Sequence, residues 1–88
     1  MSASLLKYRI SVGQEQVVVA MRNGAIIRAV GVQRPSEICL WAEVPDDTPV
    51  ITRTFRVIGT GWDVPDPGIY LGTVFDAPLV WHVYEVTA

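Results

Sequence analysis

The segment Gly59-Thr60-Gly61-Trp62-Asp63 carries the most suggestive chemistry in this sequence. Two glycines beside a threonine let backbone N–H groups converge on an anion, and the Thr60 hydroxyl adds another donor. Trp62 offers a flat ring on which a base can stack. The segment lacks the lysine of a phosphate-binding P-loop, and no helical pattern follows it. A strand-ending turn with a packing tryptophan is the competing interpretation.

His82 and Cys39 are the only histidine and the only cysteine. A histidine acting as a general base needs an orienting group and a nucleophile within hydrogen-bond reach, and the spacing of residues predicts neither. We therefore assign no catalytic residue and expect no enzymatic activity, with chemistry built on His82 and Cys39 as the alternative. His82 and Trp41 are candidate ligand contacts. Packing is the competing role for both, and Cys39 is expected to be a small buried hydrophobe.

Arg56 shares a strand face with Thr52 and Thr54, where its guanidinium could hold a phosphate or a carboxylate. The competing role is an exposed, solubilising arginine. Asp46 and Asp47 supply too few carboxylates for a calcium or magnesium site, and one cysteine cannot build a cysteine-rich zinc site. We expect no metal and no cofactor. The candidate ligand-binding residues are Trp41, Arg56, Gly59, Thr60, Gly61, Trp62 and His82.

Short apolar runs separated by Gly, Pro, Asn and Asp predict strands and no long helix. Asn23-Gly24 predicts a type I′ turn that joins two strands in a hairpin, and Asp76-Ala77-Pro78 predicts a last hairpin. Gly13 is predicted to end the first strand. We expect one all-β domain over residues 1–88, a small antiparallel β-sandwich or barrel. Its seven predicted strands are Lys7–Val12, Val17–Arg22, Ala25–Val32, Ile38–Val44, Ile51–Ile58, Ile69–Phe75 and Leu79–Val86.

The 88-residue chain is 50% hydrophobic and only 18% charged. This apolar fraction is more than one small core easily hides. The runs Ile38–Val44 and Leu79–Val86 carry large apolar groups on both faces, a pattern typical of strands buried on both sides. We therefore expect a homo-oligomer, in which a second buried face is a subunit interface.

The net charge is −2, and Lys7 is the single lysine among seven basic residues. Nucleic-acid binding through a basic face requires clustered lysine and arginine, so we expect no nucleic-acid partner. No run approaches the roughly 20 apolar residues of a membrane-spanning helix, so no membrane association is expected. Residues 1–6 do not resemble a signal peptide. We expect the protein in the cytoplasm of the host cell that makes it.

From Cys39 onward the chain resembles a family of short phage and prophage proteins, the DUF7352 domain of unknown function. Five short blocks carry the resemblance: Cys39-Leu40-Trp41-Ala42, Arg53-Thr54-Phe55-Arg56, Gly59-Thr60-Gly61, Leu71-Gly72-Thr73-Val74 and Leu79-Val80-Trp81-His82-Val83-Tyr84-Glu85. Members of this family commonly have histidine after the Gly-Thr-Gly block, where this chain has Trp62. The resemblance implies a phage-borne accessory protein and implies no activity.

Three functions follow as expectations. The first is a non-enzymatic phage accessory protein that binds and modulates a host protein, as a homo-oligomer. The second is a protein that sequesters a nucleotide signal and so counters host antiphage defence. The third is a structural protein of the virion.

Overall fold

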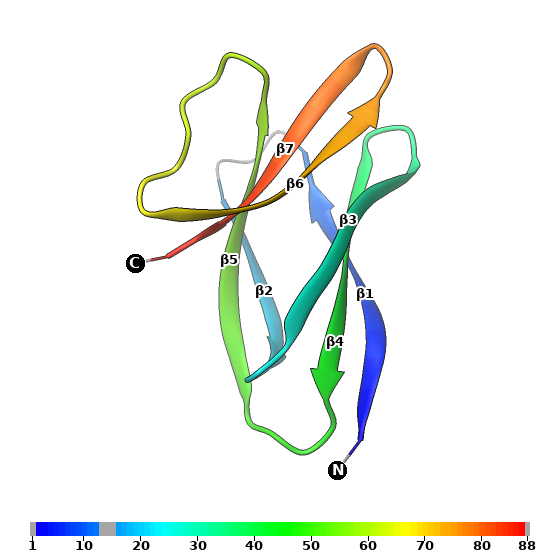
Figure 1. Ribbon diagram of the computed structural model, residues 1–88, viewed down its shortest axis with the longest axis vertical. Coiled ribbons are helices and arrows are strands. Elements are labelled where there is room, and N and C mark those ends of the chain that lie inside the picture. The colour runs from blue at the N-terminus through cyan, green and yellow to red at the C-terminus, as the bar shows by residue number, and fades with distance from the viewer. Residues whose placement is uncertain (1, 13–15, 88) are drawn as a thin grey trace.

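The computed structural model describes residues 2–12 and 16–87, which form seven antiparallel strands in two sheets packed as a sandwich (Figure 1). The sandwich prediction is confirmed, and the barrel alternative is wrong because the two sheets do not close on each other. The strands are β1 (Ala3–Ser11), β2 (Val17–Arg22), β3 (Ile26–Arg34), β4 (Glu37–Pro45), β5 (Val50–Gly59), β6 (Gly68–Asp76) and β7 (Leu79–Val86). Gly13 lies outside the described residues.

The smaller sheet has the order β1-β4-β3, and the larger sheet has the order β2-β5-β7-β6. Alternate residues of each strand face the core, as the period of two requires. In β4 the buried set includes Ile38 and Leu40, and in β7 it includes Trp81 and Val83. Phe55 of β5 is fully buried among them. One face of β4 and one face of β7 therefore pack into the core.

The two sheets approach each other closely where β3 lies beside β6 (Figure 1). A Cβ atom placed on Gly72 would lie 2.5 Å from Cγ2 of Val30, closer than any real Cβ contact. Only glycine at position 72 therefore permits this approach. The turn between β3 and β4 is also held to the end of β6, because the Ser36 amide donates a 2.8 Å hydrogen bond to Asp76 Oδ2.

The hairpin predicted at Asn23-Gly24 is wrong. β2 pairs with β5 in the larger sheet, whereas β3 pairs with β4 in the smaller one, so residues 22–25 cross between the sheets. Gly24 has a φ of 88°, but Asn23 is not in the positive-φ region that a type I′ turn requires. The chain changes sheet again between β4 and β5, and hydrogen bonds join the two crossings. The Asn23 amide donates to Pro49 O at 2.8 Å, and the Thr48 hydroxyl donates to Asn23 O at 2.7 Å.

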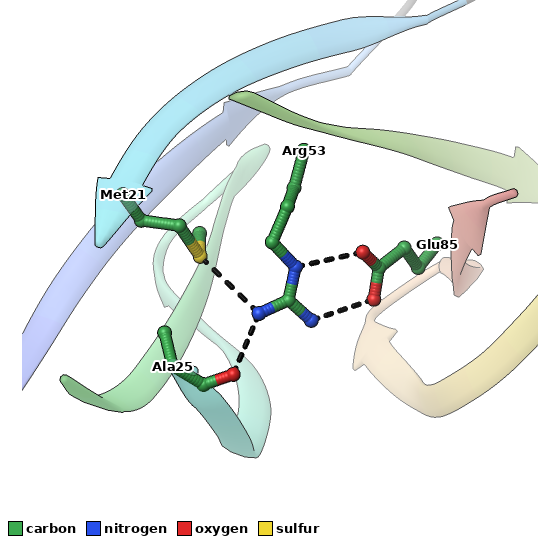
Figure 2. A network of polar contacts seen from close by, with 4 residues as sticks. All are labelled: Met21, Ala25, Arg53 and Glu85. Atoms are coloured by element: carbon green, nitrogen blue, oxygen red, sulfur yellow. Dashed lines mark hydrogen bonds and ion pairs between the residues drawn. The ribbon is translucent and has the colours of Figure 1, made fainter. Parts of the chain in front are cut away.

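Arg53 of β5 stabilises the same corner from inside the sandwich (Figure 2). Its guanidinium donates two 2.7 Å hydrogen bonds to the carboxylate of Glu85 and one of 2.6 Å to the carbonyl of Ala25. Only 18% of the Arg53 side chain and 15% of the Glu85 side chain are exposed. The hydrogen bonds from Arg53 to Glu85 raise the pKa of the guanidinium further. Because Ala25 directly precedes β3, this ion pair fixes the chain where it enters the smaller sheet.

Candidate functional site

The turn at Gly59-Thr60-Gly61-Trp62 is closed by a 3.1 Å hydrogen bond from the Trp62 amide to Gly59 O. Gly61 has a φ of 93°, the conformation that glycine adopts at the third position of a type II turn. A Cβ on Gly59 would lie 3.1–3.4 Å from three ring atoms of Trp62, so glycine leaves room for the indole. The turn thus seats Trp62. It does not form the full set of converging amides expected for an anion, because the Trp62 N–H is already bonded within the turn.

Trp62 is 52% exposed and meets the buried ring of Trp81 edge to face, with 6.0 Å between ring centroids. This geometry is favourable for aromatic pairs, and about half of Trp62 stays exposed although Gly59 lies against the ring. The ring therefore lies in a fixed position at the surface rather than in the core.

The chain after Trp62 runs back along the larger sheet before β6 begins (Figure 1). β5 ends at Gly59 opposite Trp81, and β6 starts at Gly68 opposite Val86, so residues 60–67 span most of the length of β7. This loop covers part of the outward-facing side of the sheet, and Ile58 is only 3% exposed there although it faces outward.

Between this loop and the sheet lies a hollow of about 220 Å³, here named the face hollow. Two aromatic side chains, Trp62 and Tyr84, contribute to its wall, together with the polar groups of Thr60 and His82. No Asp, Glu, Lys or Arg lines it among the residues that the structure describes. The full lining is Ile58, Gly59, Thr60, Gly61, Trp62, Val64, His82 and Tyr84.

His82 is held at both ring nitrogens. Its Nε2 lies 3.0 Å from Thr60 Oγ1, and its Nδ1 lies 3.0 Å from Thr73 Oγ1. Thr73 also shares a short hydrogen bond with the hydroxyl of Tyr70, whose ring packs against Tyr84 with 5.4 Å between centroids. The imidazole is therefore fixed in orientation by two neutral hydroxyls, with no carboxylate in the chain of hydrogen bonds.

Arg56 lies on the same outward face, opposite Tyr84 on the neighbouring strand. Within the described ranges 2–12 and 16–87 it forms no ion pair or side-chain hydrogen bond, whereas Arg9, Arg28 and Arg53 each pair with a glutamate. The strand residues on this face of β2, β5, β7 and β6 include no Asp or Glu. Arg56 thus has charge to offer a ligand.

A second hollow, of about 430 Å³, also has Trp62 in its lining and is here named the tip hollow. It separates Trp62 from the turn between β6 and β7, and Trp81 forms part of its wall. The indole N–H of Trp81 is buried and finds no acceptor in the described part of the chain. The full lining is Gly59, Thr60, Trp62, Pro78, Leu79, Val80 and Trp81.

The predicted site residues are mostly brought together. Gly59, Thr60, Gly61, Trp62 and His82 line the face hollow, and Arg56 lies beside it. Trp41 is not part of this site, because β4 belongs to the smaller sheet, where the Trp41 ring packs over Gly31. Cys39 is fully buried within one chain, and this burial raises the pKa of its thiol. It contributes no nucleophile to His82.

The sequence prediction missed Thr73, Tyr70 and Tyr84. Counting back from the two-residue turn Ala77-Pro78 places Thr73 opposite His82, so that contact was readable from the predicted hairpin. The position of Tyr70 could not be predicted in this way, because a bulge between Tyr70 and Gly72 shifts the register.

A third hollow, of about 540 Å³, is elsewhere, and no predicted site residue lines it. Its lining includes Arg9 and Glu37, which pair with each other at 3.5 Å. In the described ranges no group of three potential metal ligands occurs. Nor do those ranges hold a helix long and apolar enough to cross a membrane.

The strand order and the surface around Trp62 define a two-sheet antiparallel β-sandwich with an aromatic hollow on the outer face of its larger sheet. The chain belongs to the DUF7352 family, a domain of unknown function whose model matches residues 1–88. The match extends the resemblance, noted from Cys39 onward, to the whole chain. No curated protein and no solved structure matches the chain.

Proposed function

We propose that the protein is a non-enzymatic accessory protein of a bacteriophage that binds and modulates a host protein, as an oligomer of identical chains. The phage source rests on the resemblance described above. The binding part rests on one surface, the tip patch, formed by Trp62, Phe75, Pro78, Leu79 and Val80.

The tip patch comprises apolar residues from two segments, the turn after β5 and the turn between β6 and β7 with its flanking residues, and both segments lie at the same end of the sandwich (Figure 1). Phe75 is 74% exposed, the largest fraction among the exposed large hydrophobic residues that the structure describes, and Leu79 is 46% exposed. Trp62, at 52%, lines the tip hollow together with Leu79 and Val80, and Phe75 is paired with Val80 on the neighbouring strand. Aromatic residues that flank a hollow are the usual anchors of protein interfaces, where a few such side chains dominate the binding energy. This concentration of exposed aromatic and aliphatic side chains is the observation that carries the proposal.

Comparative affinity capture from host lysate tests the proposal. The bait is the wild-type chain, the double variant Phe75→Ser/Leu79→Ser, or the control Leu5→Ser. Leu5 is 68% exposed but lies on β1 of the other sheet, so it is a matched loss of exposed apolar surface. The proposal expects a host protein recovered with the wild type and with Leu5→Ser and lost with the double variant. The same recovery with all three baits, or recovery of no host protein, would refute it.

The oligomer part has its own test, because each protomer has a mass of 9.7 kDa. Light scattering on the purified chain should give a multiple of that mass. A mass of one protomer at all concentrations would contradict it. The oligomer was expected partly because the β4 strand is apolar on both faces. Cys39, on the outer face of β4, is already fully buried within one chain, so its burial needs no subunit interface.

A further inference from the structure

We propose that the face hollow binds a nucleotide, with its base against Trp62 and its phosphate at Arg56. This site shares Trp62 with the tip patch but otherwise uses different residues, and the inference does not depend on the proposed protein partner. The ligand is a free nucleotide rather than a nucleic-acid strand, because Arg56 is the one cation that the described part of the chain places beside the hollow, and strand binding relies on many cations.

The aromatic wall is the first argument. Trp62 is fixed by the turn that Gly59 and Gly61 allow, so little conformational freedom is lost when a flat ring packs against it. Tyr84 also lines the hollow and is itself held by its contact with Tyr70. Stacking on a preordered aromatic ring is the general way in which proteins bind bases without requiring one sequence.

The hydrogen-bonding groups are the second argument. When His82 carries its proton on Nδ1, the Thr60 hydroxyl donates to Nε2 and turns lone pairs to the hollow. When the proton is on Nε2, that N–H donates to Thr60 Oγ1, and the Thr60 hydroxyl is free to donate to a ligand. Thr60 can therefore meet either a donor or an acceptor on the edge of a base. The hydrogen-bonding groups of Thr60 and His82 therefore suit the mixed donors and acceptors on the edge of a nucleobase.

The position of Arg56 is the third argument. It precedes Ile58 of the hollow by two residues on the same strand face, roughly 7 Å along the strand, and neighbours Tyr84 across the sheet. That spacing is within the reach of one nucleotide. The guanidinium has no carboxylate partner in the described part of the chain, and arginine binds phosphate in a bidentate, charge-assisted manner.

Calorimetric titration separates the two parts of the ligand. The probes are the four ribonucleoside 5′-monophosphates, the matching nucleosides, inorganic phosphate and a short single-stranded oligonucleotide. We expect at least one monophosphate to bind, its nucleoside to bind about tenfold more weakly, and phosphate alone to show no saturable binding. A charge-assisted hydrogen bond is of the size that gives this tenfold difference.

Three variants assign the contacts. Arg56→Gln should weaken the monophosphate to the affinity of the nucleoside and leave the nucleoside unchanged. Trp62→Ala should weaken both ligands, roughly 5- to 150-fold for the loss of one stacked base. Trp41→Phe, on the other sheet, is the control and should change neither. Circular dichroism and the melting temperature of each variant verify that it is folded.

The result is decisive in each direction. Failure of every monophosphate to bind, equal binding of phosphate alone, or binding of the oligonucleotide while the mononucleotides fail would overturn the inference. Binding that survives both Arg56→Gln and Trp62→Ala would also overturn it. The variant Phe75→Ser/Leu79→Ser keeps Arg56, Trp62 and His82, so it should bind the nucleotide normally. Loss of the protein partner and loss of the nucleotide are thus separate outcomes.

Discussion

Replacing Arg53 with methionine should destabilise the protein by about 2–4 kcal/mol. The variant leaves the carboxylate of Glu85, only 15% exposed, without its two hydrogen bonds, and leaves the Ala25 carbonyl without its side-chain donor. Removing one partner of a fully buried ion pair costs about 3–5 kcal/mol, whereas an exposed pair contributes about 1 kcal/mol or less. The small remaining exposure of both side chains places this pair nearer to the buried limit.

The matched control is the pair Arg28–Glu43 on the smaller sheet. Its contact of 2.8 Å is nearly as short as the 2.7 Å contact of Arg53 with Glu85, but its side chains are 52% and 42% exposed. Arg28→Met should therefore cost no more than about 0.5 kcal/mol. Urea denaturation followed by tryptophan fluorescence measures the free energy of unfolding of both variants. A shift of the midpoint reports a change in stability as long as the m value is unchanged.

The double variant Arg53→Met/Glu85→Leu tests the reason for the loss. If the cost of Arg53→Met comes from a stranded carboxylate, replacing Glu85 as well should recover most of it, because apolar pairs often substitute for buried ion pairs at little cost. The reasoning is refuted if Arg53→Met costs no more than Arg28→Met, or if the double variant is less stable than Arg53→Met alone.

Three further perturbations test other parts of the structure. Gly72→Ala should destabilise the fold by about 1–2 kcal/mol, because its methyl group would overlap Val30. Val30→Ala should reduce the drop in melting temperature that Gly72→Ala causes. An unchanged melting temperature for Gly72→Ala would contradict the packing. Gly24→Ala should cost about 1 kcal/mol because of its φ of 88°, while Asn23→Ala should cost much less. A larger loss at Asn23 than at Gly24 in urea titrations would contradict this account of the crossing. The raised pKa of Cys39, caused first by burial, leaves stability unaffected below about pH 8, where the thiol is protonated in both states. Above the ordinary cysteine pKa of about 8.5 the unfolded thiol ionises first, so stability should fall with pH by up to about 1.4 kcal/mol per unit; Cys39→Ala should lack this part of the slope, and identical slopes would argue against the effect.

Local pattern was sufficient to predict where the strands lie. The bounds of Val17–Arg22 and Leu79–Val86 agree with the structure, and the β6–β7 hairpin was predicted from its turn residues. Local pattern did not predict which strand each strand pairs with. Asn23-Gly24 has the composition of a hairpin turn, but the same residues serve a crossing whose bonds come from Thr48 and Pro49, some 25 residues later. No local signal distinguishes the two.

In the candidate site, too, residue types could be recognised locally, whereas contacts between distant segments could not. Thr60 and Trp62 were recognised by residue type, and their neighbourhood followed from one turn. Their contact with His82 required the returning loop and the pairing of β5 with β7, which sequence spacing does not reveal. Trp41 was grouped with them because it too is a large aromatic residue, yet the sheet to which its strand belongs is decided by long-range pairing.

The crossings between sheets also bear on how the chain reaches its native state. Only β3 with β4 and β6 with β7 are neighbours both in sequence and in a sheet, so these two hairpins can form early and locally. β1 and β2 must wait for β4 and β5, which are synthesised later. During translation the amino-terminal third therefore emerges with its pairing edges uncovered, and the newly made chain is most prone to aggregation until residues beyond 59 have left the ribosome.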